Sequence, residues 1–297
     1  MIQRDRLDPV AMATITVLCA LWAFHQVAVK VANAGISPAF QCGLRSLGAL
    51  VLLLGWAAWR RIPLFQRDGT LFAGLVAGAM FAAEFALIYW SLEFTEVARS
   101  VLFLYTAPFF VAIGAHLFLP GEHIRRAQVV GLLCAFAGVV LAVSDGLSLP
   151  SARALIGDAM MLLAGALWAA TTIVIKATRL ARIAPEKTLA YQLAVSGVTL
   201  TLLAPLFGEI GIFSPAPLVM ASLAYQIVIV AFASYLGWFV LVRIYPATRL
   251  AAFTFLTPVF AVGFGALVLS ERVSALLIAA LALVAFGIWL VNRPEPA

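Results

Sequence analysis

The dominant pattern in the sequence is a series of long apolar runs, each about 20 residues in length and separated by short polar segments. Runs of this length are typical of helices that cross the hydrocarbon core of a bilayer. The pattern predicts an all-α polytopic membrane protein with ten transmembrane helices, over residues 10–32, 37–60, 68–92, 97–119, 124–143, 153–177, 187–207, 217–242, 247–269 and 273–292.

Two of these segments are related copies, because residues 97–119 and 247–269 share several identities in a gapless alignment. Both carry a proline near the middle, Pro108 in the first copy and Pro258 in the second. A proline inside a helix removes a backbone donor and bends the helix. In a bilayer the freed carbonyl is tolerated only against protein or a water-filled cavity. We therefore expect Pro108 and Pro258 to act as hinges beside an interior polar space.

The duplication extends over the whole chain. The run LWAFHQVAVK at 21–30 matches LWAATTIVIK at 167–176. We predict two five-helix repeats, residues 1–147 and 148–297. Because five is an odd number, the second repeat must enter the membrane from the opposite side, so the repeats are inverted. Inverted repeats are a common plan of alternating-access transporters.

Composition and charge support the membrane assignment. Hydrophobic residues make up 64% of the 297 positions, charged residues only 11%, and the mean hydropathy is +1.08. With the N-terminus in the cytoplasm, fourteen cationic residues fall on that side, namely Arg4, Arg6, Arg60, Arg61, Arg67, Arg125, Arg126, Lys176, Arg179, Arg182, Lys187, Arg243, Arg249 and Arg293. The other side receives Lys30, Arg99, Arg153 and Arg272. The bias predicts that both termini are cytoplasmic, and it explains the net charge of +6 without a nucleic-acid partner.

The sequence gives little support to catalysis. Its three cysteines lie inside apolar runs, which fits packing rather than disulfides, and it has no metal-ligand set or nucleophile motif. We expect no cofactor and no metal. An intramembrane enzyme remains the alternative from another class, and a channel is disfavoured because no ring of like polar groups is visible.

Aromatic and hydrogen-bonding residues gather near the middle of several predicted helices, where they could line a cavity for a molecule that is partly apolar and partly polar. The candidate binding residues are Trp22, His25, Gln26, Glu84, Tyr105, Trp168, Thr171, Thr172, Ser234, Tyr235, Trp238, Thr254 and Thr257. The alternative is that these side chains only pack and tie the helices together.

Glu84 is the most informative of them, because a carboxylate deep in a membrane span is costly and by default functional. Arg45 is predicted at the same depth, so the two could form a structural or coupling ion pair. Alternatively, Glu84 faces the cavity and exchanges a proton, or it binds a substrate ammonium. The corresponding positions of the second repeat are Ser234 and Gln192, so the pair is not part of the repeated scaffold.

Taken together, these features resemble the drug/metabolite transporter superfamily of the EamA type. The resemblance rests on the ten spans in two halves, the two LWA motifs, the proline helices, and the Gly121-Glu122 and Ser270-Glu271 pairs. Within that superfamily the chain is most similar to the YddG-type exporters of aromatic amino acids. Trp22, Glu84, Tyr105 and Trp168 fall where such exporters have cavity residues. Ala107 departs from them, since they can carry Trp there, so the resemblance implies either aromatic substrates or a wider amino-acid range.

The expected function is a multi-pass transporter of the bacterial inner membrane. It would export small amphipathic metabolites, most of all amino acids including aromatic ones, by alternating access around a midplane cavity. Its partners would be the small-molecule substrate and the lipid bilayer, with the chain acting as a monomer. The main alternative is a proton-coupled antiporter of lipophilic cationic drugs that uses Glu84. A carrier of sugars or nucleotide sugars would be expected to have more basic groups in its cavity.

Overall fold

The computed structural model describes residues 4, 6–91, 94, 95, 97–144, 147, 149–268 and 275–293. Over these residues the secondary structure is helical, with short connections and one isolated bridge between Ile36 and Ile212. Ten segments of this part of the chain are long and apolar enough to cross a membrane, which confirms the predicted spans. The α-helices are α1 (Pro9–Ala32), α2 (Pro38–Trp59), α3 (Leu71–Ser91), α4 (Val97–Leu104), α5 (Ala107–Phe118), α6 (Arg126–Val143), α7 (Ala152–Ala177), α8 (Pro185–Leu203), α9 (Pro217–Tyr225), α10 (Tyr235–Ile244), α11 (Ala247–Phe253), α12 (Leu256–Val268) and α13 (Ala275–Asn292).

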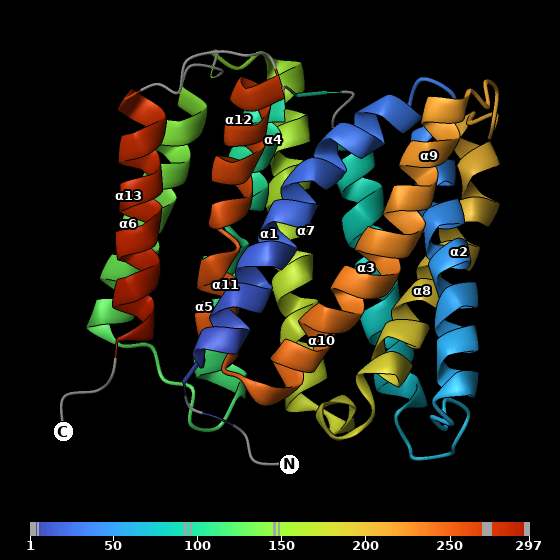
Figure 1. Cartoon of the computed structure of the whole chain (residues 1–297), viewed down its shortest axis with the longest axis horizontal. Coiled ribbons are helices and arrows are strands. Elements are labelled where there is room, and N and C mark those ends of the chain that lie inside the picture. Colours follow the sequence, from blue (N-terminus) through green and yellow to red (C-terminus); the bar gives the residue numbers. More distant parts are fainter. Residues whose placement is uncertain are drawn as a thin grey trace.

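The spans alternate in direction across the molecule, and α1 begins at the same face at which α13 ends (Figure 1). We call this face, where α1 begins and α13 ends, the terminal face. Lys176 is near the end of α7 and lies toward the terminal face, whereas Lys30 is near the end of α1 and lies toward the opposite face. That the terminal face is cytoplasmic stays a prediction.

Counterpart helices of the two predicted halves pack against each other. α2 contacts α8 and α6 contacts α13, and in both cases the partners occupy corresponding places in the two predicted halves. α6 and α13 stand together at one edge of the bundle (Figure 1). Glycines let them approach closely, since a Cβ added to Gly287 would lie 2.4 Å from the carbonyl oxygen of Gly131.

Both predicted kinks are present. A break separates α4 from α5 just before Pro108, and a second break separates α11 from α12 just before Pro258. Both prolines are buried inside the protein. At the first break the carbonyl oxygen of Leu104 lies against α7, only 2.8 Å from the position of a Cβ on Gly165. Glycine is therefore needed where α7 passes the kink, while the role of the prolines as hinges stays a prediction.

The span predicted over residues 217–242 is not a uniform α-helix. Between α9 and α10 the segment Gln226–Ser234, η4, is π-helical. Its wider turns change which side chains face the centre of the bundle, and π segments occur often at functional sites. The last residue of η4, Ser234, donates a hydrogen bond from its hydroxyl to the carbonyl oxygen of Val230 at 2.6 Å.

Candidate functional site

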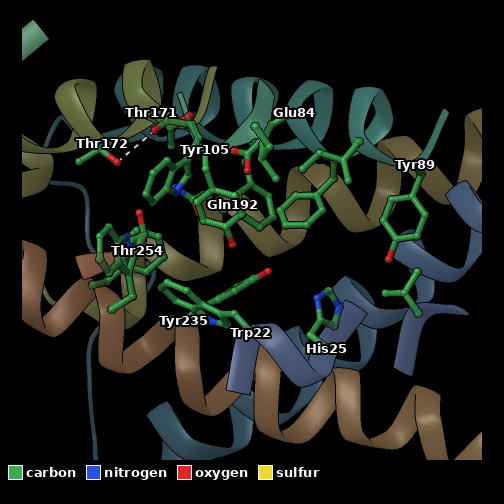
Figure 2. Close-up of a pocket in the computed structure, with 18 residues that line it drawn as sticks. Trp22, His25, Glu84, Tyr89, Tyr105, Thr171, Thr172, Gln192, Tyr235 and Thr254 are labelled. Carbon is green, nitrogen blue, oxygen red and sulfur yellow. Dashed lines mark hydrogen bonds between the residues drawn. The ribbon is translucent and has the colours of Figure 1, made fainter. Parts of the chain in front are cut away.

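A cavity of about 140 Å³ lies inside the bundle (Figure 2). Its wall is formed by α1, α3 and α4 of the first predicted half, by α7, α8 and α10 of the second, and by the break between α11 and α12. α6 and α13 contribute no lining residue. The lining consists of Trp22, His25, Val29, Phe81, Glu84, Phe85, Ile88, Tyr89, Leu104, Tyr105, Trp168, Thr171, Thr172, Gln192, Tyr235, Trp238, Phe239 and Thr254.

Most of the predicted candidates lie together around this cavity. Those that line it are Trp22, His25, Glu84, Tyr105, Trp168, Thr171, Thr172, Tyr235, Trp238 and Thr254. Ser234 and Thr257 are buried but do not line it. The side chain of Gln26 lies outside the described part of the chain.

Aromatic rings form a continuous band in the cavity wall. The centroid of the Trp238 ring is 5.6 Å from that of Trp22, edge to face, and 5.7 Å from that of Trp168, stacked. The Tyr235 ring continues the band, at 6.4 Å from Trp22 and 5.9 Å from Phe81. These distances are those of favourable aromatic pairs, so the rings hold each other in place. Such a wall suits an apolar or aromatic part of a bound molecule.

Ser234 acts behind this wall rather than in it. The indole nitrogen Nε1 of Trp22 donates a hydrogen bond to the hydroxyl oxygen of Ser234 at 2.9 Å. This bond joins α1 of the first half to η4 of the second and fixes the orientation of the Trp22 ring. Ser234 is therefore a positioning residue, not a lining residue as the sequence suggested.

The predicted ion pair between Arg45 and Glu84 is not formed. Within the described part of the chain no salt bridge joins them, and the Glu84 carboxylate oxygen Oε2 is buried without a hydrogen-bond partner there. Glu84 instead lines the cavity and is only 5% exposed (Figure 2). Of the arrangements left open by the sequence, the structure has the carboxylate at the cavity.

Arg45 is absent from the lining, and its environment explains the missing pair. The residue is fully buried, with its guanidinium carbon 4.2 Å from the centroid of the Phe85 ring. Its Nη2 donates to the Cys42 sulfur at 3.4 Å, and its Nη1 lies 3.5 Å from Nε2 of His25. Arg45 and Glu84 do not pair, because Phe85, the neighbour of Glu84 on α3, is the residue that covers the guanidinium.

Three further polar side chains of the lining end in buried atoms without a partner in the described residues. They are the amide of Gln192, the hydroxyl of Thr171 and the hydroxyl of Tyr89. Leaving such groups unpaired in a low-dielectric interior is costly. Together with Glu84 they can hydrogen-bond a molecule that has both a cationic and an anionic or carbonyl group.

Some residues that line the cavity are not among the candidates predicted from the sequence. Phe81, Phe85 and Ile88 share with Glu84 the face of α3 that meets the cavity, at helical spacings of three and four. Extending that face from Glu84 would have found them. Gln192, which the sequence indicates only as the counterpart of Arg45 in the second predicted repeat, also lines the cavity.

On the terminal-face side, Lys176 ties several elements together. Its Nζ donates to the carbonyl oxygens of Tyr245 at 2.7 Å and Val242 at 3.2 Å, and lies 3.4 Å from Oε1 of Glu122. Glu122 also accepts a hydrogen bond from the backbone N–H of Ala247 at 3.1 Å. These contacts, which we call the Lys176 clasp, join α7, the α10–α11 corner and the α5–α6 loop.

Ten membrane-spanning segments around a polar and aromatic cavity define a multi-pass membrane protein built to handle a small molecule. The chain belongs to the EamA-like transporter family, whose pattern it matches over residues 10–144 and 155–293. It is thus a membrane transporter rather than an enzyme.

Two similar proteins carry names that describe them as transporters. The chain is 27% identical to an uncharacterized transporter of Archaeoglobus fulgidus, covering 85% of this chain and 86% of the relative. It is 22% identical to the uncharacterized transporter YoaV of Bacillus subtilis, over 94% of this chain and 95% of the relative. A WAT1-related chloroplastic protein of Arabidopsis thaliana is 27% identical over 92% of this chain and 67% of its own length. One solved protein structure superposes with a TM-score of 0.82 at 17% identity, covering 95% of this chain and 96% of that one, which shows the shared fold.

Proposed function

We propose that this transporter exports amino acids, including aromatic ones, across the bacterial inner membrane, with the terminal face in the cytoplasm. The observation that carries the proposal is the composition of the cavity wall. It combines a band of aromatic rings with one unpaired carboxylate and several unpaired hydrogen-bonding groups. The charge bias of the sequence supports the orientation, and the YddG-type resemblance supports the substrate class.

In this proposal each part of an amino acid has a complementary group. The ammonium meets the carboxylate of Glu84 in a charge-assisted hydrogen bond. The carboxylate accepts from the amide of Gln192 and the hydroxyl of Thr171. The side chain lies against the rings of Trp22 and Trp168, where an aromatic substrate would gain most.

Alternating access would follow from the two inverted halves. On α1 the lining runs from Trp22 to Val29, and on α3 from Phe81 to Tyr89, so on both helices it extends away from the terminal face. The Lys176 clasp lies at the terminal-face side. We infer that the clasp closes the cytoplasmic path in this conformation, and that its release accompanies opening toward the cytoplasm.

Replacement of Lys176 by Met should favour conformers that are open at the terminal face. It removes two hydrogen bonds and an ion pair, and since hydrogen bonds to charged groups contribute about 1.5–3 kcal/mol each, we expect at least a tenfold shift in the conformational equilibrium. The readout is the rate at which a membrane-impermeant maleimide labels a cysteine introduced at Val242, in a background without the natural cysteines. Lys30→Met is the matched control, because exposed Lys30 is the counterpart of Lys176 in the other repeat. Equal labelling of the Lys176 and Lys30 variants would contradict the clasp.

The proposal is tested by counterflow in proteoliposomes. Vesicles loaded with an unlabelled amino acid should transiently accumulate the labelled form, with aromatic amino acids among the best substrates and protein-free vesicles inactive. Simple sugars and nucleotide sugars should not exchange. The absence of counterflow for every amino acid tested would refute the proposed substrate class without affecting the family assignment.

A second candidate function is favoured by one observation. Because Glu84 faces the cavity unpaired, it could instead exchange a proton for a lipophilic cation, as in a drug antiporter. In that case a pH gradient would drive uptake of a cation such as tetraphenylphosphonium, and amino acids would not compete with it.

A further inference from the structure

Arg45 is a buried charge for which the cavity lining alone gives no role. The residue is fully buried within α2, and in the described part of the chain no carboxylate forms a salt bridge with it. Its Nε also has no hydrogen-bond partner there. Burial of a guanidinium inside a membrane span is costly, and an ionisable residue in such a place indicates a function by default.

The guanidinium of Arg45 lies directly behind the cavity wall. Its central carbon is 4.2 Å from the centroid of the Phe85 ring and 5.8 Å from that of Tyr235, and its Nη1 lies 3.5 Å from Nε2 of His25. All three of these neighbours line the cavity. The charge is therefore separated from the cavity by single side chains, and in a medium of low dielectric constant it acts strongly over such a distance.

The opposite charge of this region, Glu84, is at the cavity itself. Phe85 follows Glu84 on α3 and covers the guanidinium of Arg45, so its ring lies where a direct ion pair would otherwise form. Figure 2 shows Glu84 and His25 approaching the cavity from different sides. Two opposite charges that are held apart in this way can both act on a molecule in the cavity.

Together the two charges determine which net charge a bound molecule should carry. When both are ionised, Glu84 and Arg45 sum to zero. A zwitterion then leaves the loaded site neutral, whereas a simple cation or anion leaves a net charge inside the membrane, which costs free energy. Without Arg45, the carboxylate of Glu84 would instead favour a cation, because that combination is the neutral one.

We propose that Arg45 determines the charge of the transported molecule: from behind Phe85 and His25 it disfavours cations that lack an acidic group and so selects zwitterions. The inference rests on the proposed function, because it concerns the same cavity. It also bears on the second candidate function, since a lipophilic cation in this cavity would be repelled by Arg45.

The test compares three ligands that share one skeleton and differ in charge at neutral pH. Phenylalanine is a zwitterion, phenethylamine a cation and hydrocinnamate an anion. Their binding to the purified full-length protein in an uncharged detergent is followed by tryptophan fluorescence, since Trp22, Trp168 and Trp238 line the cavity. In the wild type, phenylalanine should bind at least about tenfold more tightly than either of the other two ligands.

The variants assign this preference to the two charges. Arg45→Gln should reduce the preference for phenylalanine over phenethylamine by at least about tenfold. Glu84→Gln should shift the preference toward hydrocinnamate, and it serves if Arg45→Gln does not fold. The double variant is neutral again and should move both ratios back toward the wild-type values. Arg67→Gln is the control, because it removes an exposed arginine in the loop between α2 and α3 and should keep all three affinities.

An unchanged preference in the variants, or the same shift in Arg67→Gln, would overturn the inference. So would an equal weakening of all three ligands in Arg45→Gln, which would show a structural role only, or the absence of binding of all three to the wild type. Failure of the proposed function gives a different result. If phenylalanine binds with the expected preference but shows no counterflow, export is refuted and the inference stands. If counterflow occurs and Arg45→Gln leaves the preference unchanged, the inference fails and the proposed function stands.

Discussion

Replacement of Glu84 by Gln should raise the amino-acid concentration at half-maximal counterflow by roughly 10- to 100-fold, because a hydrogen bond to a charged group is worth about 1.5–3 kcal/mol. Gln keeps the shape of the side chain but removes the charge that faces the cavity. The measurement is the initial rate of labelled amino-acid uptake over a range of concentrations. Glu186→Gln is the matched control, because Glu186 lies in the first turn of α8 and outside the cavity lining.

The same variant separates the two candidate functions. If the protein is an amino-acid carrier, counterflow at saturating substrate should persist in Glu84→Gln, since downhill exchange needs no titratable group. If it is a proton-coupled antiporter, uptake of tetraphenylphosphonium driven by a pH gradient should be lost altogether. An unchanged half-saturation concentration together with unchanged pH-driven uptake would show that Glu84 has no part in transport.

Replacement of Asp158 by Asn should cause the largest loss of stability, about 3–5 kcal/mol, because it removes the carboxylate from a largely buried ion pair. Asp158 lies in α7 and is 3% exposed. It accepts hydrogen bonds from the hydroxyl of Thr95 at 2.8 Å and from Nε of Arg99 at 3.3 Å, with a second guanidinium nitrogen of Arg99 also bound. These contacts hold the start of α4 against α7. The fall in Tm in detergent should be on the order of 10 °C.

The control for Asp158→Asn is a double variant in which both partners of the ion pair are replaced. Arg99→Met combined with Asp158→Leu removes both charges, and buried pairs replaced by apolar residues of similar size are often close to neutral. The double variant should therefore recover much of the stability lost in Asp158→Asn. A single variant as stable as the wild type, or a double variant worse than the single, would show that burial of the charge is not the cause.

The features predicted best from the sequence are those determined by local chemistry. Apolar runs of membrane length predict the ten spans, and the prolines of the two related segments predict both helix breaks. Trp22 and Trp168, at matching places in the two repeats, do face one cavity, as does Glu84. These inferences depend on spacing along one helix or on a repeat, and both can be read without knowing how helices rotate against each other.

The remaining features depend on how each helix is rotated about its axis and on which neighbour each side chain contacts. The sequence predicts Arg45 and Glu84 at the same depth, but depth does not show which neighbour the guanidinium meets, and it meets Phe85. Asp158 is a further carboxylate inside a span, where burial is costly, but its pairing with Thr95 and Arg99 across a helix contact has no signal in the sequence. The role of Ser234 depends on the π-helical turns of η4, for which the sequence has no signal.

The hydrogen bond from Trp22 to Ser234 joins the two predicted five-helix repeats, and it has a consequence for how such proteins diverge. A chimera that took only one half from a relative would keep one of these residues with a foreign neighbour, so the indole would lose its fixed orientation. Substitutions at the two positions are therefore expected to be epistatic, tolerated together where each alone is not. Changes of preferred cargo in such a lineage would then proceed through coordinated exchanges between the halves rather than through independent drift of either one.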